Sequence, residues 1–572
     1  MHWTTLAVAL IVLTRFCKAK IPNRNPYDEV ASARIDQRDP LVVDLGYAIY
    51  NGFTDANSSV NIWKGLHYAT PPLKSLRFKA PEVPDINRGA IQHAWTDPPA
   101  CMQAQRNMSL GREMLKMSED CLFLNVFAPS NATELPVFVW IHGGGYNAGS
   151  ASAFDPSALM KAGNNGFVSV IVQYRLGPYG FLSSEEVKDA GGLNAGIQDV
   201  QLTLQWVQKY IGMFGGDPRH VTIAGESAGA GAVMILATAY GGGLGPTLFE
   251  NSITASPFLP QTFHFNEQVI LEQYWTFAKS AGCSRLDSLR CLQAASTESL
   301  AFATAAVASK SLSGTFSFKP VVDGDLVPQR LSKTLDGPLN GKRVLTGNNA
   351  NEGFAFTPQN ITTLDAFTAY LGTYFPRLTA DNITAITSVY TTPADVLDSD
   401  VAPKFATSGV FSPTALNQSQ VSTGHQQVAN NFYAEVTFAC PSYWLAGAYM
   451  RASDRAAFQY QFSVTPALHG FDTLFYFPAR ERPVDAGVSR AFMDAYAGFV
   501  AEGVPDDWPQ KTAAEPLMRN LNATGGRRIG TGPFTMFEGA DVAQGDVDAD
   551  VWEGGRRMRC DFLRSLADEL VI

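Results

Sequence analysis

The chain has 572 residues, of which 46% are hydrophobic and 17% charged, so it has ample material for a large packed core. Its 49 Gly and 33 Pro residues are near ordinary usage, which excludes collagen-like and low-complexity chains. With 43 basic and 53 acidic residues the net charge is −10 and no basic cluster stands out, so we expect no nucleic-acid binding, because phosphate neutralisation needs a Lys/Arg stripe.

The first predicted element is the apolar run Leu6–Leu13. It is too short to span a bilayer, which takes about 20 residues, and it has the length of a signal-peptide core. Small residues at Cys17 and Ala19 then predict cleavage after residue 19. We therefore expect residues 1–19 to be a signal peptide, with a signal anchor as the alternative, and the protein to be secreted without a stable membrane anchor.

Cysteine and asparagine usage agrees with an oxidising compartment. Without Cys17, six cysteines remain, and they allow fifteen pairings between which this count does not choose. They are Cys101, Cys121, Cys283, Cys291, Cys440 and Cys560. None has the C-x-x-C spacing of a metal site, so we expect neither metal nor cofactor. Seven sequons mark candidate glycosylation sites at Asn57, Asn107, Asn131, Asn360, Asn382, Asn417 and Asn522.

Strand-like and helix-like segments alternate between Leu135 and Asp217. Residues 135–141 and 168–174 are continuous apolar runs, residues 202–207 have a helical pattern, and residues 220–224 predict another strand. Apolar strands separated by helices predict a mostly parallel sheet with helices on both faces. No linker interrupts the chain, so we expect one α/β domain over residues 20–572 with helical insertions, including a helical and loop-rich region at about 357–427.

A G-x-S-x-G sequence, Gly225–Gly229, lies between the predicted strand and the helix-like run 230–237. Between a strand and a helix this pattern is typical of a nucleophile elbow, in which small residues allow a tight turn that exposes a serine hydroxyl. It predicts Ser227 as a nucleophile. The backbone N–H of Ala228 and a glycine-rich loop at the end of an earlier strand, His142–Gly145, would bind an oxyanion.

An elbow nucleophile needs a histidine base later in the chain, and His264, His425 and His469 are the candidates. His264 leaves little room for the acid, and His425 lies in a polar segment typical of a helix start at the surface. His469 follows the strand-like run 457–463 and precedes Gly470, so we predict it as the base.

The acid is expected on a loop after a strand as well. Residues 343–346 predict a strand that leads to Glu352, which would accept the hydrogen bond of His469 and orient the ring. Asp323 and Asp325 are the rivals, but their Asp-Gly sequence is more simply explained as a turn.

These residues lie in motifs that resemble the type-B carboxylesterase family. Phe214–Gly229 (FGGDPRHVTIAGESAG) matches its signature in full, and Glu119–Pro129 (EDCLFLNVFAP) is similar to a second one, with Phe123 where Tyr or Thr is usual. Residues 65–72, 77–81, 174–182 and 194–199 are similar to further family stretches. The resemblance runs from about residue 40 to the C-terminus and points to the cholinesterase, carboxylesterase and lipase group, nearest to its secreted fungal members.

The resemblance implies an α/β-hydrolase fold and a Ser227, Glu352 and His469 triad. It implies an oxyanion hole of Gly144, Gly145 and Ala228. Two structural ion pairs, Arg77 with Glu119 and Arg175 with Asp199, are implied in the same way. Glu226 is shared by the family without being the triad acid. As in the family's cholinesterases, we expect Cys101–Cys121, Cys283–Cys291 and Cys440–Cys560 disulfides, the first two joining cysteines close in sequence.

The function implied is secreted hydrolysis of small to medium carboxylic esters through an acyl-enzyme, with a small-molecule ester as the partner. The 19 residues between Cys101 and Cys121 are few for a lipase lid and contain no aromatic residue that would stack on choline. Other loops could supply one, for example from Phe354, Phe356 or Phe471. A triacylglycerol lipase, an acyl-transferring biosynthetic enzyme and a catalytically silent binding protein are the alternatives, and the oligomeric state stays open.

Overall fold

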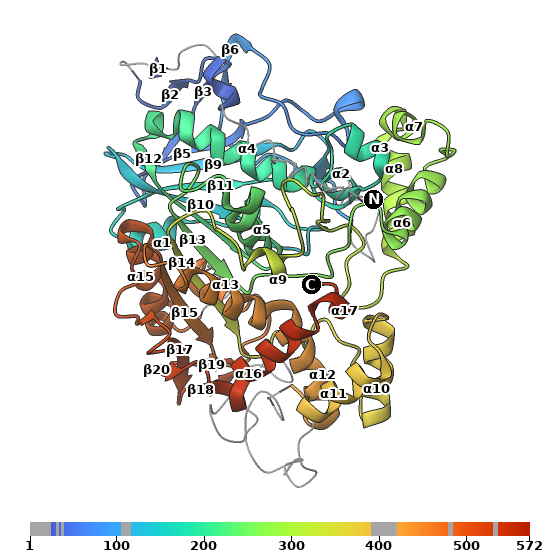
Figure 1. The fold of residues 1–572 in the computed structure, drawn as a ribbon. Helices are drawn as coiled ribbons and strands as arrows, with labels where there is room; N and C mark the ends of the chain where they lie inside the picture. The colour runs from blue at the N-terminus through green and yellow to red at the C-terminus, as the bar shows by residue number, and fades with distance from the viewer. Residues whose placement is uncertain are drawn as a thin grey trace, which may run out of the picture.

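A 12-stranded mixed sheet runs through the molecule (Figure 1). The computed structural model describes residues 25–29, 34–35, 39–104, 116–390, 419, 421–478, 484–529 and 536–572. The signal peptide expected at residues 1–19 and the sequons at Asn107 and Asn417 lie outside these residues.

The strands of this sheet follow one another in a fixed order from the C-terminal to the N-terminal edge. They are β20 (Asp541–Asp548), β17 (Leu517–Thr524), β15 (Ala456–Phe462), β14 (Arg343–Asn349), β13 (Asn251–Ala255), β12 (Gly216–Glu226), β10 (Leu135–Ile141), β11 (Val168–Val172), β9 (Phe123–Pro129), β5 (Val60–His67) and β4 (Phe53–Asp55), with β16 (Gln510–Lys511) beside β15. Neighbouring strands from β17 to β11 are parallel, whereas β20, β16, β9, β5 and β4 are antiparallel to their neighbours.

Both faces of the sheet are covered, as the alternating side chains of β10 show. Val137, Val139 and Ile141 belong to the core cluster that includes α4 (Ala195–Tyr210) and α5 (Ala228–Thr238). Phe138 and Trp140 belong to the opposite cluster, with α1 (Ser157–Ala162) and α15 (Ala486–Glu502). Burial on both faces therefore explains why this strand is apolar on both sides. The predicted α/β-hydrolase fold class is confirmed.

Further elements surround this core. The helices are α2 (Gly177–Phe181), α3 (Glu185–Asp189), α6 (Gln268–Ser280), α7 (Ser288–Ala294), α8 (Thr297–Ala308), α9 (Leu331–Thr334), α10 (Leu364–Tyr374), α11 (Ala380–Tyr390), α12 (Gly424–Ala434), α13 (Cys440–Met450), α14 (Thr473–Tyr476), α16 (Trp552–Ser565) and α17 (Ala567–Leu570). The short strands are β1 (Arg34–Ile35), β2 (Val42–Asp44), β3 (Ala48–Asn51) and β6 (Asn87–His93) in one sheet, and the pairs β7 (Ala100–Cys101) with β8 (Met117–Ser118) and β18 (Arg527–Ile529) with β19 (Met536–Glu538). In the part of the chain that the structure describes, no helix is both long enough and apolar enough to cross a membrane.

The five described sequons differ in exposure. Asn57, Asn131 and Asn360 are exposed, whereas Asn382 and Asn522 are half-buried. The first three therefore offer their side-chain amides to solvent.

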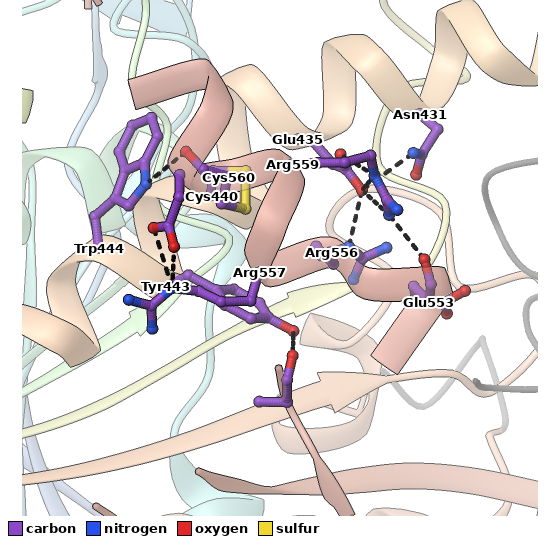
Figure 2. The surroundings of a disulfide bond; sticks show 12 residues. Asn431, Glu435, Cys440, Tyr443, Trp444, Glu553, Arg556, Arg557, Arg559 and Cys560 are labelled. Carbon is purple, nitrogen blue, oxygen red and sulfur yellow. Dashed lines mark hydrogen bonds and ion pairs between the residues drawn. A yellow bond between two sulfur atoms is a disulfide. The ribbon is translucent and has the colours of Figure 1, made fainter. Parts of the chain in front are cut away.

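The C-terminal helix α16 is fastened to the core by charge and by a disulfide (Figure 2). A π-helical turn, Glu435–Ala439, joins α12 to α13, and its Glu435 is fully buried. Arg556 and Arg559 of α16 donate to this carboxylate, at 3.1 and 2.7 Å. Burial alone would raise the pKa of Glu435, but the two guanidinium groups outweigh it and lower the pKa to about 2. The ion pairs thus hold the π-helical turn against α16.

The described residues form three disulfides, and these are the pairs expected above: Cys101–Cys121, Cys283–Cys291 and Cys440–Cys560. The third joins the start of α13 to α16 across 120 positions of sequence.

We expect the double variant Cys440→Ser/Cys560→Ser to lose about 4–5 kcal/mol of unfolding free energy, because this crosslink closes a long loop in the unfolded chain. The matched control Cys283→Ser/Cys291→Ser opens a loop of only 8 positions and should lose less, about 2.5–3 kcal/mol. Guanidinium denaturation measures both losses. A free thiol at Cys440 or Cys560 in non-reducing peptide mapping of the native protein would contradict the pairing.

Candidate active site

Ser227 lies at a sharp turn between β12 and α5. Its backbone angles, φ 56° and ψ −123°, are rare for a residue with a side chain. Two glycines make the turn possible, because a Cβ on Gly225 would come within 2.4 Å of the Gly229 carbonyl carbon, and a Cβ on Gly229 within 2.0 Å of the Ile141 oxygen. The G-x-S-x-G sequence is therefore required by close backbone packing.

The carboxyl ends of the parallel strands bring the predicted residues together. Ser227 directly follows β12, Glu352 follows β14 and His469 follows β15. His469 Nε2 lies 2.8 Å from Ser227 Oγ, and His469 Nδ1 is hydrogen-bonded to Glu352 Oε2. The structure thus places the three side chains in one continuous line of contacts.

Glu352 is itself held in place. It is buried, and its Oε1 accepts hydrogen bonds from the Ser256 hydroxyl and from the Asn349 backbone N–H, both at 2.5 Å. One carboxylate oxygen is therefore fully engaged in orientation while the other faces His469.

The rival residues have other roles. The Asp323 carboxylate accepts from the N–H groups of Asp325 and Val327, which is the turn expected from the sequence. His264 is exposed, and His425 is half-buried in the first turn of α12. None of these side chains has a recorded contact with Ser227.

The loop after β10 lies against the elbow. Asn147 holds it by donating to the Gly145 carbonyl at 2.7 Å and to the Phe318 carbonyl at 2.6 Å. Among the described residues, no acceptor is recorded for the backbone N–H groups of Gly144, Gly145 or Ala228. These N–H groups are available to a ligand next to Ser227, which is where the sequence predicts an oxyanion hole.

Both ion pairs implied by the resemblance are present. Arg77 Nε lies 2.5 Å from Glu119 Oε2, and Arg175 Nη2 lies 2.6 Å from Asp199 Oδ1. All four side chains are buried. Arg175 directly follows Tyr174, whose hydroxyl donates to the His142 carbonyl at 2.9 Å, so this pair supports the loop after β10.

Three carboxyl groups lie around the imidazole of His469. Glu226 Oε1 lies 3.2 Å from His469 Nε2, and burial raises the pKa of Glu226 to about 8. Asp472 is buried nearby, accepts from Asn349 Nδ2 at 3.0 Å, and has a pKa raised to about 6 by burial. Burial would lower the pKa of His469, but Glu352 and Glu226 outweigh it and raise the pKa to about 9.

A pocket with mostly apolar walls, which we call the Phe316 pocket, adjoins these residues. It is lined by residues 258–261, 314–316, 319, 374–375, 433, 436–437 and 572, has a cavity volume of about 40 Å³ and opens to solvent. The backbone N–H of Phe258 donates to the Ser227 carbonyl at 3.1 Å, and the Phe316 ring lies where a Cβ on Gly145 would project. The pocket therefore borders both the elbow and the glycine-rich loop.

Several residues of the site were not identified from the sequence. Ser256 directly follows the buried strand β13. The search for polar residues just after a strand, which selected Ser227 and Glu352, would also have found it. Phe438 lies on the His469 ring, with centroids 4.1 Å apart, but an aromatic residue in a helical pattern carries no such signal. Of the aromatics suggested in advance, Phe356 lies 5.1 Å from the His469 ring, whereas Phe471 packs against Phe462 in the other core.

This arrangement can activate a serine hydroxyl. A histidine between a serine and a buried carboxylate can remove the serine proton, and free backbone N–H groups beside the serine can stabilise negative charge on a substrate oxygen. Among the described residues, no group of three or more His, Cys, Asp or Glu side chains could hold a metal ion.

Comparison with known proteins agrees with this chemistry. The Carboxylesterase family model matches residues 42–531. Carboxylesterase patB of Aspergillus clavatus is 29% identical over 525 residues, which are 82% of this chain and 89% of that protein. A secreted triacylglycerol lipase of Gibberella zeae is 31% identical over 397 residues, 63% of this chain and 67% of the lipase. The crystal structure of Aspergillus niger EstA matches with a TM-score of 0.75 and 27% identity, covering 94% of this chain and all of that one.

We expect Glu226→Gln to lower the pKa of His469, because the amide removes a carboxylate that favours the charged imidazole. An NMR pH titration of the histidine ring protons, with the His469 signal assigned by its loss in His469→Gln, measures the shift. Glu186→Gln, on α3 with its carboxylate bonded to Ser288, is the control and should leave this pKa unchanged. An unchanged or higher pKa in Glu226→Gln would contradict the electrostatic coupling.

Proposed function

The chain belongs to the carboxylesterase family and is a carboxylic ester hydrolase, and on this basis we propose that it is a secreted serine esterase for small to medium esters. In this proposal Ser227 is the nucleophile, His469 the general base and Glu352 the acid that orients it. Gly144, Gly145 and Ala228 supply the oxyanion hole.

One observation carries the proposal: the line of contacts from Ser227 Oγ through His469 to Glu352. Each member follows the carboxyl end of a different parallel strand, so residues 227, 352 and 469 meet through the fold and not through local sequence. Chance proximity does not explain why the imidazole has the serine on one nitrogen and the carboxylate on the other.

The reaction proceeds in two halves. His469 takes the proton of Ser227 Oγ as that oxygen attacks the ester carbonyl, and the three N–H groups stabilise the oxyanion. His469 then protonates the leaving alcohol, and an acyl-enzyme remains on Ser227. Water attacks this acyl group with His469 again as the base, which releases the acid and restores the serine.

Glu352 contributes through orientation and charge. Because Ser256 and Asn349 bind its other oxygen, the carboxylate cannot rotate away from His469 Nδ1. It keeps Nε2 directed at the serine and stabilises the imidazolium that forms as the serine attacks.

The compartment is proposed on separate grounds. Three disulfides and a relative named as a secreted lipase fit an extracellular location. We propose that residues 1–19 direct the chain there and are removed, that residues 20–572 act as one catalytic domain, and that the exposed sequons are glycosylated.

The catalytic assignment is tested at Ser227. We expect Ser227→Ala to fold normally and to retain less than about a thousandth of the wild-type activity, because alanine fits the elbow but cannot attack. A fluorophosphonate probe followed by peptide mapping should label Ser227 in the wild type and nothing in the variant. Label on another serine, or substantial activity in Ser227→Ala, would overturn the assignment.

The substrate range is tested with soluble 4-nitrophenyl esters of increasing acyl length, with choline esters and with emulsified triolein. Since the short loop between Cys101 and Cys121 carries no aromatic residue, we expect simple saturation with soluble esters and no advantage for choline over a neutral alcohol. Mass spectrometry of the products should find the free acid. Sharp activation by the emulsion would indicate a lipase, a hundredfold choline preference a cholinesterase, and transfer of the acyl group to an added alcohol a transferase.

A further inference from the structure

Among the described residues that line the Phe316 pocket, Lys319 alone has a charged side chain. It lies on the segment between α8 and α9, three residues after Phe316, whose ring touches the glycine-rich loop at Gly145. Lys319 is therefore a cationic residue in a pocket whose other side chains are aromatic, aliphatic or neutral.

The ammonium group of Lys319 has no anionic partner in the described part of the chain. Its Nζ lies 5.5 Å from the centroid of the Phe263 ring, and none of the ion pairs of the described residues includes it. Burial alone lowers the pKa of Lys319 to about 8, whereas a nearby carboxylate would have raised it. The side chain is thus a half-buried cation, and no described residue supplies its counter-ion.

Neighbouring cations are neutralised. Arg377, whose guanidinium lies over the same Phe263 ring at 5.4 Å, is paired with Glu267. Arg330 is paired with Asp568 at 2.9 Å. Lys319 differs from both in having no such partner among the described residues. A desolvated charge without a partner gains more from an incoming anion than a charge that is already paired.

The pocket also adjoins the reacting groups. Val436 and Thr437 line it, and the next residue, Phe438, lies on the ring of His469. The backbone N–H of Phe258, on another wall, donates to the Ser227 carbonyl at 3.1 Å. The pocket therefore lies beside the segments that position Ser227 and His469.

We propose that Lys319 binds an anionic group of the substrate, so that this enzyme prefers esters that also carry a carboxylate, such as monoesters of dicarboxylic acids. The proposal rests on the proposed esterase function and specifies its substrate class. The apolar walls take the methylene groups, and the ammonium takes the carboxylate in a charge-assisted hydrogen bond.

The experiment compares esters matched in length. The 4-nitrophenyl monoester of glutaric acid carries a carboxylate on the acyl side, and 4-nitrophenyl pentanoate is its neutral counterpart. The butanoyl ester of glycolic acid carries the carboxylate on the alcohol side, and ethyl butanoate is its neutral counterpart. We expect kcat/KM to be at least tenfold higher for the anionic member of one pair, and that pair identifies which part of the substrate faces Lys319.

Three variants test the residue. Lys319→Met keeps the length without the charge and should lose the preference at least tenfold, mainly through KM, with the neutral esters changing less than threefold. Lys319→Arg keeps the charge and should retain the preference. Lys310→Met, at an exposed position on the same connecting segment, makes the same change in net charge and should change nothing. A preference that is absent in the wild type, or unaltered in Lys319→Met, overturns the proposal.

Binding separates this proposal from the catalytic one. Calorimetry with Ser227→Ala should show the preferred anionic ester binding at least tenfold more tightly than its neutral counterpart, and Lys319→Met in the same background should abolish the difference. Equal binding overturns the role of Lys319 even if Ser227 is the nucleophile. Selective binding by a protein that fluorophosphonate does not label at Ser227 would support Lys319 and overturn the catalytic assignment alone.

Discussion

The backbone of Ser227 is the constraint on which the site depends. A residue with a side chain at φ 56° and ψ −123° costs on the order of 1–3 kcal/mol and persists only where the surroundings enforce it. Here β13 and α5 enforce it from both sides, since the N–H of Ser227 donates to the carbonyl of Ala255, the last residue of β13, at 2.9 Å, and the Ser227 carbonyl accepts from the N–H of Gly231 in α5 at 2.8 Å. The strain directs the hydroxyl toward the edge of the sheet where the other strands end.

Strand order then decides which residues meet. Because β12, β13, β14 and β15 are consecutive and parallel, the residues that follow them gather at one edge. This is why chain positions as distant as 227, 352 and 469 could be selected from the sequence: apolar runs mark the strands, and polar residues after them mark the edge. The fold class was predictable for the same reason, whereas the antiparallel strands at both sheet edges carry weaker patterns.

The pocket could not be predicted in this way. Phe316, Tyr433 and Val436 come from a loop, a helix and a π-helical turn, and each resembles an ordinary core residue in its local sequence. The π-helical turn is held by Glu435 and two arginines more than 100 residues away, and nothing local to residue 435 indicates those partners. The role proposed for Lys319 could not be predicted either. That no described residue supplies a counter-ion to Lys319 is a property of its folded surroundings and not of its own segment.

The distribution of charge determines how a substrate can enter this site. Glu226, Glu352 and Asp472 surround a single imidazole, so the acidic groups of the site gather around His469. A carboxylate on a substrate is attracted instead to a cation elsewhere in the site. Lys319 lies on the loop wall beyond Phe316, apart from these acids, and no acidic group contributes to its pKa. Because Lys319 lies apart from these acids and has no ion-pair partner among the described residues, a substrate can present its carbonyl to Ser227 and its charge to Lys319.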